Sequence, residues 1–324
     1  MPLLPALLIV NPAAGPVWSR ARGRLEPLRR LLAARGFDAE LRTTEAPGHA
    51  TVLARDAVSR GVAAVFALGG DGTQRETAAG LLGGPIPLGL LPAGTANLLA
   101  PSCGLPRTAL LAAGCFGVED DGGKARPRAR DLDVGVLEDR GGERPFLMMA
   151  SRGLDARALA TLRPALKRRL GKAGIALGGL GEWVRAGEPS FDYVADGEPG
   201  RASFLAVQNV AGYGGVAAMA PAADPFDGHL DLVAFAGAGR VATLSFAAEV
   251  LTRRHRRDPR VLMQPVDRVD LPGSGPVPMQ LDGDPVDVAL PATVRLHSLK
   301  LRLLVPARQA RAATAPPERA GAAA

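Results

Sequence analysis

The first hundred residues alternate short apolar runs with helical patterns, and a turn of small residues follows each apolar run. This alternation predicts a doubly wound parallel sheet with helices on both faces. Ligands of such sheets bind beyond the carboxyl ends of the strands. The expected strands are 3–10, 37–44, 63–68 and 86–91, and the expected helices are 19–36, 48–61, Thr73 to Leu82 and 95–100.

After residue 130 the pattern changes to many short strand-like segments separated mostly by Gly, Pro or Asp turns, which predicts a mostly antiparallel β domain. Two helical stretches interrupt it, at about 156–186 and 240–257. Residues 307–324 are poor in bulky apolar side chains, which predicts a disordered tail. We therefore expect an α/β domain over 1–130 and a β domain over 131–306.

Composition narrows the classes of partner. The net charge of +7 favours anionic partners, although almost all basic residues are Arg, and heavy use of Ala, Gly and Pro indicates a compositional bias. Aromatic residues make up only 4%, too few for base-stacking platforms, so we expect no nucleic-acid partner. Two cysteines and four scattered histidines form no disulfide framework or zinc spacing, which favours a reducing cytoplasmic compartment.

Turns rich in small residues follow all four predicted strands of the first domain, at 11–15, 43–50, 69–73 and 92–97. Because the strands are parallel, the turns lie at the same sheet edge. Glycine allows close backbone approach, and a following helix directs free N–H groups and its positive dipole end at a ligand. The edge therefore suits a polyphosphate, although neither G-x-x-x-x-G-K-[ST] nor G-x-G-x-x-G after the first strand is present.

Asp71 lies within the turn at 69–73, where its carboxylate would repel phosphates unless a cation lies between them. Mg²⁺ would remove the conflict. The alternative is that Asp71 only stabilises a turn, but the four converging turns favour a metal or nucleotide role. Thr73 and Glu76 have the spacing of a capping box at a helix start, and a cap is compatible with a site role.

Six motifs, in their order and spacing, resemble the diacylglycerol kinase catalytic family, which includes bacterial lipid kinases and sphingosine kinases. The resemblance covers roughly residues 3–305. "GGDGT" alone also resembles loops of NAD kinases and phosphofructokinases, so the ordered set carries the specificity. The motifs are "NPAAG" (11–15), "GGDGT" (69–73) with Glu76 following, "PAGTANLLA" (92–100), "ARDLDVG" (129–135), "PAADPFDGHLDL" (221–232) and "LDGDPV" (281–286).

The resemblance implies an ATP-dependent transfer of the γ-phosphate to a lipid hydroxyl, such as that of diacylglycerol or a sphingoid base. The reaction would take place between an α/β ATP-binding domain and a β-sandwich domain that binds the lipid. By motif, Asp71 would hold the catalytic Mg²⁺ and be essential to catalysis. The residues implied to contact ATP are Asn11, Thr44, Gly69, Gly70, Asp71, Gly72, Thr73, Gly94, Thr95 and Asp284.

Asp282 matches the family's carboxylate in an aspartate-glycine-acid triplet, which implies a general base for the acceptor hydroxyl. Asp284 stands where glutamate is usual. Without the resemblance, residues 282–284 would be interpreted as a hairpin turn. Asp224 and Asp227 match positions of a structural Mg²⁺ site in some bacterial members, and the alternative for them is a Pro-Asp-Gly turn.

Two departures from the family pattern leave the acceptor open: Leu98 follows Asn97 where the family often has aspartate, and Arg75 replaces the commoner asparagine. Basic clusters at 163–185 and 252–260 suit anionic headgroups, or else form solvated helix faces. We expect a cytoplasmic enzyme that meets the inner membrane face transiently, with a homodimer possible.

Two other functions compete with a lipid kinase: a soluble NAD-kinase-like enzyme and a catalytically silent nucleotide-binding protein. The first is disfavoured by "PAGTANLLA" and by the aspartate motifs of the β domain. The second would be expected to have lost Asp71 or Asp282, and both are present.

Overall fold

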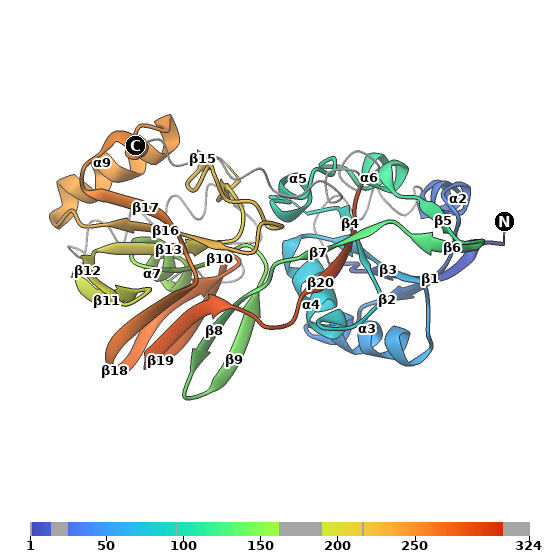
Figure 1. The fold of residues 1–324 in the computed structure, drawn as a ribbon, viewed down its shortest axis with the longest axis horizontal. Coiled ribbons are helices and arrows are strands. Elements are labelled where there is room, and N and C mark those ends of the chain that lie inside the picture. The colour runs from blue at the N-terminus through green and yellow to red at the C-terminus, as the bar shows by residue number, and fades with distance from the viewer. Residues whose placement is uncertain (1, 14–24, 95, 162–189, 216, 307–324) are drawn as a thin grey trace.

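The computed structural model describes residues 2–13, 25–94, 96–161, 190–215 and 217–306. Within these ranges the chain forms an α/β lobe with a six-stranded sheet and a β lobe with a ten-stranded antiparallel system (Figure 1). The predicted fold class, a parallel-sheet domain followed by an antiparallel β-sandwich, is confirmed. Thr95, most of the predicted helix at 156–186 and the tail at 307–324 lie outside the described residues.

The sheet of the α/β lobe begins with four parallel strands in the order β2-β1-β3-β4. Every residue of β3 and β4 is buried, as expected for parallel strands covered on both faces. Figure 1 shows α3 and α4 below this sheet and α2 and α6 above it. The bounds are β1 Leu4–Val10, β2 Phe37–Thr43, β3 Ala64–Gly69, β4 Leu88–Pro92, α2 Leu25–Ala34, α3 His49–Ser59, α4 Asp71–Leu81, α5 Leu99–Ser102 and α6 Ala109–Cys115.

The end of the chain returns to the first lobe. Strand β20 (Leu301–Leu304) lies between β4, to which it is parallel, and the antiparallel strand β7 (Ala129–Leu132). The predicted range of 131–306 for the second domain stays a prediction, and within that range β20 pairs into the sheet of the first lobe. Alternating leucines fit the surface of either sheet, and only pairing with the open edge of β4 decides between them. A separate hairpin joins β5 (Val118–Asp121) and β6 (Lys124–Pro127).

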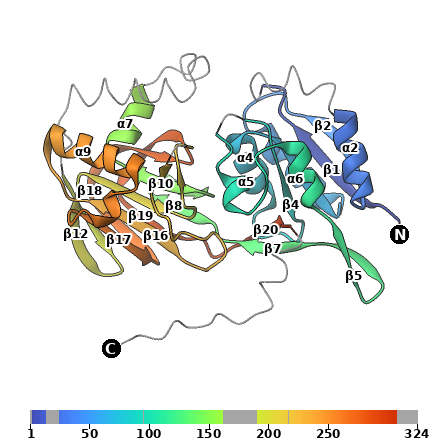
Figure 2. The same cartoon turned by 90° about the horizontal axis from the view of Figure 1, so that it is seen from above.

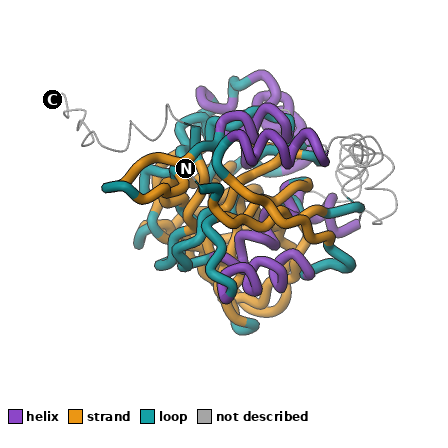
Figure 3. Tube along the Cα trace, turned by 90° about the vertical axis from the view of Figure 1, so that its right-hand side faces the viewer, coloured by secondary structure: helices purple, strands orange, loops and turns teal. Residues whose placement is uncertain are grey.

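The β lobe is antiparallel throughout, in the order β17-β16-β13-β10-β18-β19-β8-β9, with β11 and β12 attached beside β18. Figure 3 shows helices flanking the strands. No helix within the described ranges is long and apolar enough to cross a bilayer. The strands are β8 Gly135–Asp139, β9 Gly142–Phe146, β10 Met149–Arg152, β11 Phe191–Ala195, β12 Glu198–Ala202, β13 Phe204–Gln208, β14 Gly212–Tyr213, β15 Ala217–Ala218, β16 Leu230–Phe235, β17 Val261–Val266, β18 Arg268–Leu281 and β19 Asp284–Leu296. The helices are α7 Leu154–Thr161, α9 Gly239–Thr252 and the short 3₁₀ helix η2 His255–Arg257.

One buried apolar cluster extends from the first lobe into the second. It includes Leu8 and Phe66 in the α/β lobe and Val233 and Phe246 in the β lobe. A second cluster, on the other face of the β lobe's strands, includes Leu232. The shared cluster ties the two lobes together by burial alone, without specifying which polar groups meet at the junction.

The packing of α3 on α4 depends on Gly80, which leads to the first prediction. A Cβ at Gly80 would lie 2.6 Å from Ala54 Cβ and 2.6 Å from the Thr51 carbonyl oxygen. Gly80→Ala should therefore lower the free energy of unfolding by about 1–3 kcal/mol, measured by urea denaturation. Gly114→Ala in α6 is the matched control, because a Cβ there meets no described residue within 4 Å, and it should be neutral or stabilising by up to about 1 kcal/mol. Equal effects of the two substitutions would contradict this account.

Candidate active site

The turn between β3 and α4 leaves backbone N–H groups at the sheet edge. Helix α4 begins at Asp71, and Gly70 is its N-cap in an extended conformation (φ −82°, ψ −179°) with no side-chain cap. The N–H groups of the first turn have no partner within the helix. A Cβ built at Gly72 meets no atom of the described residues within 4 Å, so open space lies beside this turn in the part of the chain that the structure describes. The predicted capping box is wrong, because the helix starts before Thr73, and an acidic residue in the first turn suits the dipole there.

Two glycine-containing turns touch through their backbones. A Cβ at Gly94 would lie 2.6 Å from the Gly70 Cα, and the Ala93 N–H donates to the Gly69 carbonyl at 2.9 Å. A Cβ at Gly69 would lie 2.5 Å from the Thr73 side chain. These contacts explain why glycine is needed at 69 and 94, and they bring the predicted turns at 69–73 and 92–97 together.

Asn11 connects the end of β1 to the start of α4. Its Nδ2 donates to Thr73 Oγ1 at 2.9 Å, and its Oδ1 accepts the Ala13 N–H. Thr44 follows β2 at the same edge, and its N–H donates to the Val10 carbonyl. The structure thus gathers the described residues that were predicted to contact a nucleotide in this lobe, and the contact itself stays a prediction.

Asp71 joins the start of α4 to the start of α5. Its Oδ1 accepts the N–H groups of Leu98 (2.9 Å) and Leu99 (3.3 Å), and its Oδ2 accepts that of Leu98 at 3.2 Å. Burial raises the pKa of the Asp71 carboxyl, and these N–H bonds oppose the rise. Asp71 therefore does stabilise a turn, as the alternative interpretation of this residue predicts. A carboxylate accepts about four hydrogen bonds, so Oδ2 can still face a cation.

Asp282 lies at the tip of the hairpin formed by β18 and β19, with positive φ values of 52° at Asp282 and 86° at Gly283. The hairpin turn considered for residues 282–284 is thus present. The carboxylate accepts three backbone N–H groups, from Leu147 (2.9 Å), Met148 (2.8 Å) and Met149 (3.0 Å). Burial raises the pKa of the Asp282 carboxyl, whereas these N–H bonds and the nearby charge of Arg75 act against the rise.

Arg75 connects the two lobes at this hairpin. Its Nη1 donates to the Leu281 carbonyl at 3.1 Å, and its Nη2 donates to Asp284 Oδ2 at 2.6 Å. Arg75 follows Asp71 by four residues on α4, so both lie on the same side of the helix. The helix face that begins at the glycine turn therefore meets the Asp282 hairpin. The predicted nucleotide contact by Asp284 stays a prediction, because here its carboxylate pairs with Arg75.

The predicted structural metal site at Asp224 and Asp227 is a turn in this structure. Asp224 Oδ1 accepts the Phe226 N–H, and Asp227 Oδ1 accepts the His229 N–H at 3.0 Å. Burial, followed by the charge of Asp224, raises the pKa of Asp227. Across the part of the chain that the structure describes, no three His, Cys, Asp or Glu side chains are grouped to hold a metal. The metal role at these positions remains a prediction.

Sequence reasoning assigned no role to two residues that support the site. Asp133, in the "ARDLDVG" motif, is buried, accepts the Gly228 N–H at 2.7 Å and pairs with Lys300. Asn209 Nδ2 donates to the carbonyls of Asp133 (2.7 Å) and Leu147 (2.8 Å), which fixes the segment whose N–H groups hold Asp282. The motif around Asp133 was a usable signal, whereas Asn209 carried none.

Comparison with known proteins agrees with this geometry. The family model described as the diacylglycerol kinase catalytic domain matches residues 5–119, and the model described as the YegS C-terminal NAD kinase beta sandwich-like domain matches residues 148–305. Together they cover the lobe with the glycine turns and the lobe with the Asp282 hairpin. The chain belongs to the diacylglycerol kinase catalytic family.

Members of this family with similar sequences include a diacylglycerol kinase of Bacillus subtilis (strain 168), 27% identical over 77% of this chain and 80% of the relative. A probable lipid kinase YegS-like of Chromohalobacter salexigens is 30% identical, covering 77% and 78%. The fold matches a crystal structure of a diacylglycerol kinase from Bacillus anthracis str. Sterne with a TM-score of 0.67 at 20% identity, over 95% of this chain and 99% of that one. The name of the second family model refers to the β-sandwich of NAD kinases. The relatives, however, are named as lipid kinases, and they support a lipid kinase rather than an NAD kinase.

The ion pair between the lobes leads to the second prediction. Arg75 and Asp284 have side chains that are 27% and 46% exposed, so solvent screening limits their interaction. A double-mutant cycle of Arg75→Gln and Asp284→Asn should give a coupling of about 0.5–1 kcal/mol in the free energy of unfolding. The control cycle uses Arg126 and Asp121, which are 65% and 59% exposed and should couple less. A coupling no larger than the control would show that the pair does not join the lobes.

Proposed function

We propose that this chain transfers the γ-phosphate of ATP to the hydroxyl of a lipid such as diacylglycerol or a sphingoid base. The observation that carries the proposal is the reach of Arg75 from α4 to the Asp282 hairpin. It places the helix that starts at the glycine turn against the turn that holds a carboxylate of the other lobe. In-line phosphoryl transfer needs this facing arrangement of a phosphate site and an acceptor site.

The glycine edge fits a nucleotide's phosphates. Gly70 and Gly94 keep two turns in backbone contact, and the start of α4, which has no side-chain cap, lies beside the open space at Gly72. Backbone donors and the positive end of a helix dipole are the usual elements of a phosphate site. Asn11 holds Thr73 so that the β1 and β3 turns form one rim.

The same edge fits a magnesium ion held mainly by substrate. Mg²⁺ in phosphoryl-transfer sites is bound by one or two carboxylates together with phosphate oxygens and water. Asp71 supplies one oriented carboxylate, so a group of three protein ligands is not required. Bound Mg²⁺ and ATP would supply a phosphoryl group whose negative charge is partly neutralised. Asp71 would then hold the cation while keeping α5 in place through Leu98 and Leu99.

In this proposal Asp282 accepts the proton of the acceptor hydroxyl. Three backbone N–H groups orient its carboxylate and favour the ionised form, and burial raises its pKa, which strengthens it as a base. Arg75 keeps the hairpin against α4 and adds a permanent positive charge near the phosphate path. A catalytically silent protein would have no need to hold both carboxylates so firmly.

Gly72→Ala tests the nucleotide site separately from the fold. The added methyl group meets no atom of the described residues within 4 Å and improves helix propensity, so the melting temperature should stay equal or rise. Because the methyl group would occupy space beside the first-turn N–H groups, the affinity for Mg-ATP should fall about tenfold or more by calorimetry, corresponding to roughly 1.4 kcal/mol. Unchanged affinity would place the phosphates elsewhere.

Transfer itself is tested with purified protein, labelled ATP and Mg²⁺, offered dispersed diacylglycerol, a sphingoid base, a glycolipid or NAD. We expect label in a lipid product. Asp282→Asn keeps an oxygen for the N–H groups of Met148 and Met149, loses the acceptor of the Leu147 N–H and cannot act as a base. The kcat should therefore fall by about 10²–10⁴-fold, and a circular dichroism spectrum and melting curve check that the fold persists. Label in NAD alone would favour the NAD-kinase-like alternative, and label in no acceptor would favour a silent protein.

The pH dependence of the same reaction has a definite sign. Only the ionised form of Asp282 can accept a proton, so kcat/KM should rise with pH through its pKa. Since burial raises that pKa, the midpoint should lie above the ordinary aspartate value of about 4. The residual activity of Asp282→Asn should lack this limb. A limb of the same midpoint in the variant would assign the titration to another group.

A further inference from the structure

Helix α9 exposes a line of apolar side chains. Val241, Leu244 and Leu251 are 82%, 44% and 60% exposed, and with Ala248 they follow a spacing of three, four and three residues, which places them on one side of the helix. The buried side of the helix carries Phe246, which stacks on Phe235 with ring centroids 4.4 Å apart. Helix α9 therefore packs on the core through one apolar face, and the exposed line is a second apolar face that the core does not cover. A contiguous exposed apolar line indicates an interaction surface.

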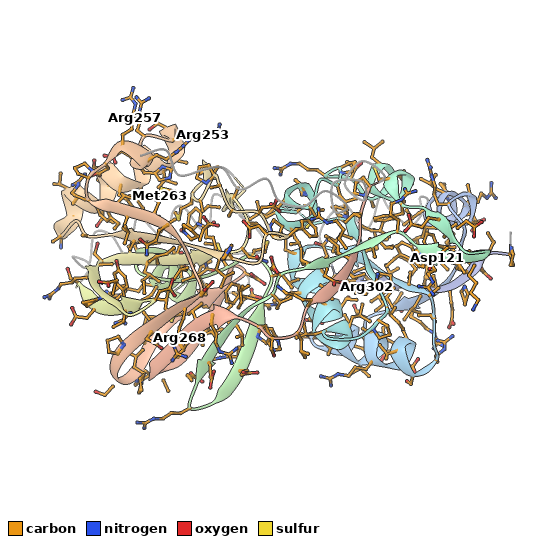
Figure 4. The ribbon with its side chains drawn as sticks, viewed as in Figure 1. Asp121, Arg253, Arg257, Met263, Arg268 and Arg302 are labelled. Carbon is orange, nitrogen blue, oxygen red and sulfur yellow. The ribbon has the colours of Figure 1, made fainter. Side chains whose placement is uncertain are left out.

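A group of unneutralised arginines lies at the end of this line. Arg253, Arg254, Arg256 and Arg257 are all exposed, and over the described ranges none of their guanidinium groups has a hydrogen-bond or ion-pair partner. Figure 4 shows Arg253 and Arg257 at the upper edge of the β lobe, above its strands. Arg260, only three residues further on, differs because Asp258 binds it in a bidentate pair.

The segment that carries these arginines is anchored. The ring of His255, between the two arginine pairs, is fully buried, with its Nε2 2.9 Å from the Met219 carbonyl oxygen. The Arg254 N–H donates to the Glu249 carbonyl at 2.8 Å. The backbone under the arginines is therefore held in place, so their charges remain beside the apolar line of α9.

The line and the arginines lie on the same side of the molecule as part of the candidate active site. Figure 1 shows α9, β15 and α5 along the upper edge of the view, and in Figure 2, which looks onto that edge, α9 faces the viewer. The hairpin of β14 and β15 lies between them: a Cβ at Gly212 would be 3.4 Å from Leu98 Cδ2, and the Met219 N–H donates to Ala211. A flat partner lying on α9 would thus also approach α5, whose start is held by Asp71.

We propose that the α9 surface, defined as Val241, Leu244, Leu251, Arg253, Arg254, Arg256 and Arg257, docks the enzyme on an anionic phospholipid bilayer. The apolar line enters the headgroup boundary, and the arginines contact lipid phosphates. The inference rests on the proposed function, since a diacylglycerol or sphingoid acceptor resides in a bilayer. It also selects the basic segment at 252–260, whereas the segment at 163–185 lies wholly outside the described residues.

The positive charge of the four arginines favours a bilayer over a second copy of the chain as the partner of the α9 surface. A symmetric dimer through this face would bring two sets of four unneutralised arginines together, and like charges in an interface oppose association. A bilayer with anionic headgroups offers the opposite charge over a flat area. Self-association through the face is therefore an outcome that the test must detect.

The test measures partitioning of the full chain onto vesicles of phosphatidylcholine with increasing phosphatidylglycerol, by flotation. Binding should increase with the anionic fraction and weaken in high salt. Replacing the four arginines with glutamine should lower the partition coefficient about 100-fold or more, since each basic residue near an anionic surface contributes roughly fivefold. Val241→Glu should lower it about tenfold. The matched controls are Val52→Glu, at a 58% exposed valine of α3, and Arg268→Gln, where the arginine pairs with Asp270, and neither should change binding.

Activity on two forms of substrate separates this proposal from the proposed function. The α9 variants should keep wild-type transfer to a water-dispersed short-chain diacylglycerol and lose transfer to diacylglycerol in vesicles. If the wild-type protein labels no lipid but binds vesicles through the α9 surface, the proposed lipid kinase function is overturned and the docking proposal is supported. Equal binding of all variants, or no wild-type binding, would overturn docking even where transfer is observed. Conversion of a dimer to a monomer by Val241→Glu in sedimentation velocity would also overturn it, in favour of a second copy.

Discussion

The contact of Arg75 with the hairpin of residues 281–284 is the constraint on which the site depends. Apolar burial joins the lobes over a wide area, but burial is not directional and would tolerate several relative placements. The guanidinium group is directional, since it donates to both the Leu281 carbonyl and the Asp284 carboxylate. Because Arg75 lies one helical turn from Asp71, the contact sets the glycine turn and the Asp282 turn against one another. The residue that departs from the family pattern is thus the one that aligns the two halves.

Asp71 and Asp282 are held by the same device. Each carboxylate comes from one segment and accepts backbone N–H groups of another: Leu98 and Leu99 for Asp71, and residues 147–149 for Asp282. Backbone donors fix the position of a carboxylate without adding a neutralising charge, and they offset the burial that raises its pKa. A structural role and a catalytic role are therefore not alternatives here. The contacts that stabilise the turns also orient the groups that the proposed chemistry uses.

Part of the site could be predicted because its signals are local. The small-residue turns after 3–10, 63–68 and 86–91 indicated a phosphate edge, since alternation of strand and helix already implies parallel strands. Other features depend on partners distant in the chain. Asn209 supports the segment that binds Asp282 from 62 residues away, and Arg75 meets Asp284 across 209 residues. The helix was expected to begin at Thr73, but it begins at Asp71. The spacing of Thr73 and Glu76 fits a capping box, and it equally fits two positions inside the helix.

By itself the sequence determined the fold class, the order of the lobes, the edge at which the glycine turns gather and the family, because periodicity and ordered motifs depend on neighbouring residues. Only the tertiary structure decided that β20 completes the first sheet, that Arg75 bridges the lobes and that one apolar line of α9 stays uncovered. The physical reason is that an apolar or charged side chain has the same local preference wherever it is. Which surface covers it, or which charge pairs with it, is settled by long-range contacts that no local pattern encodes.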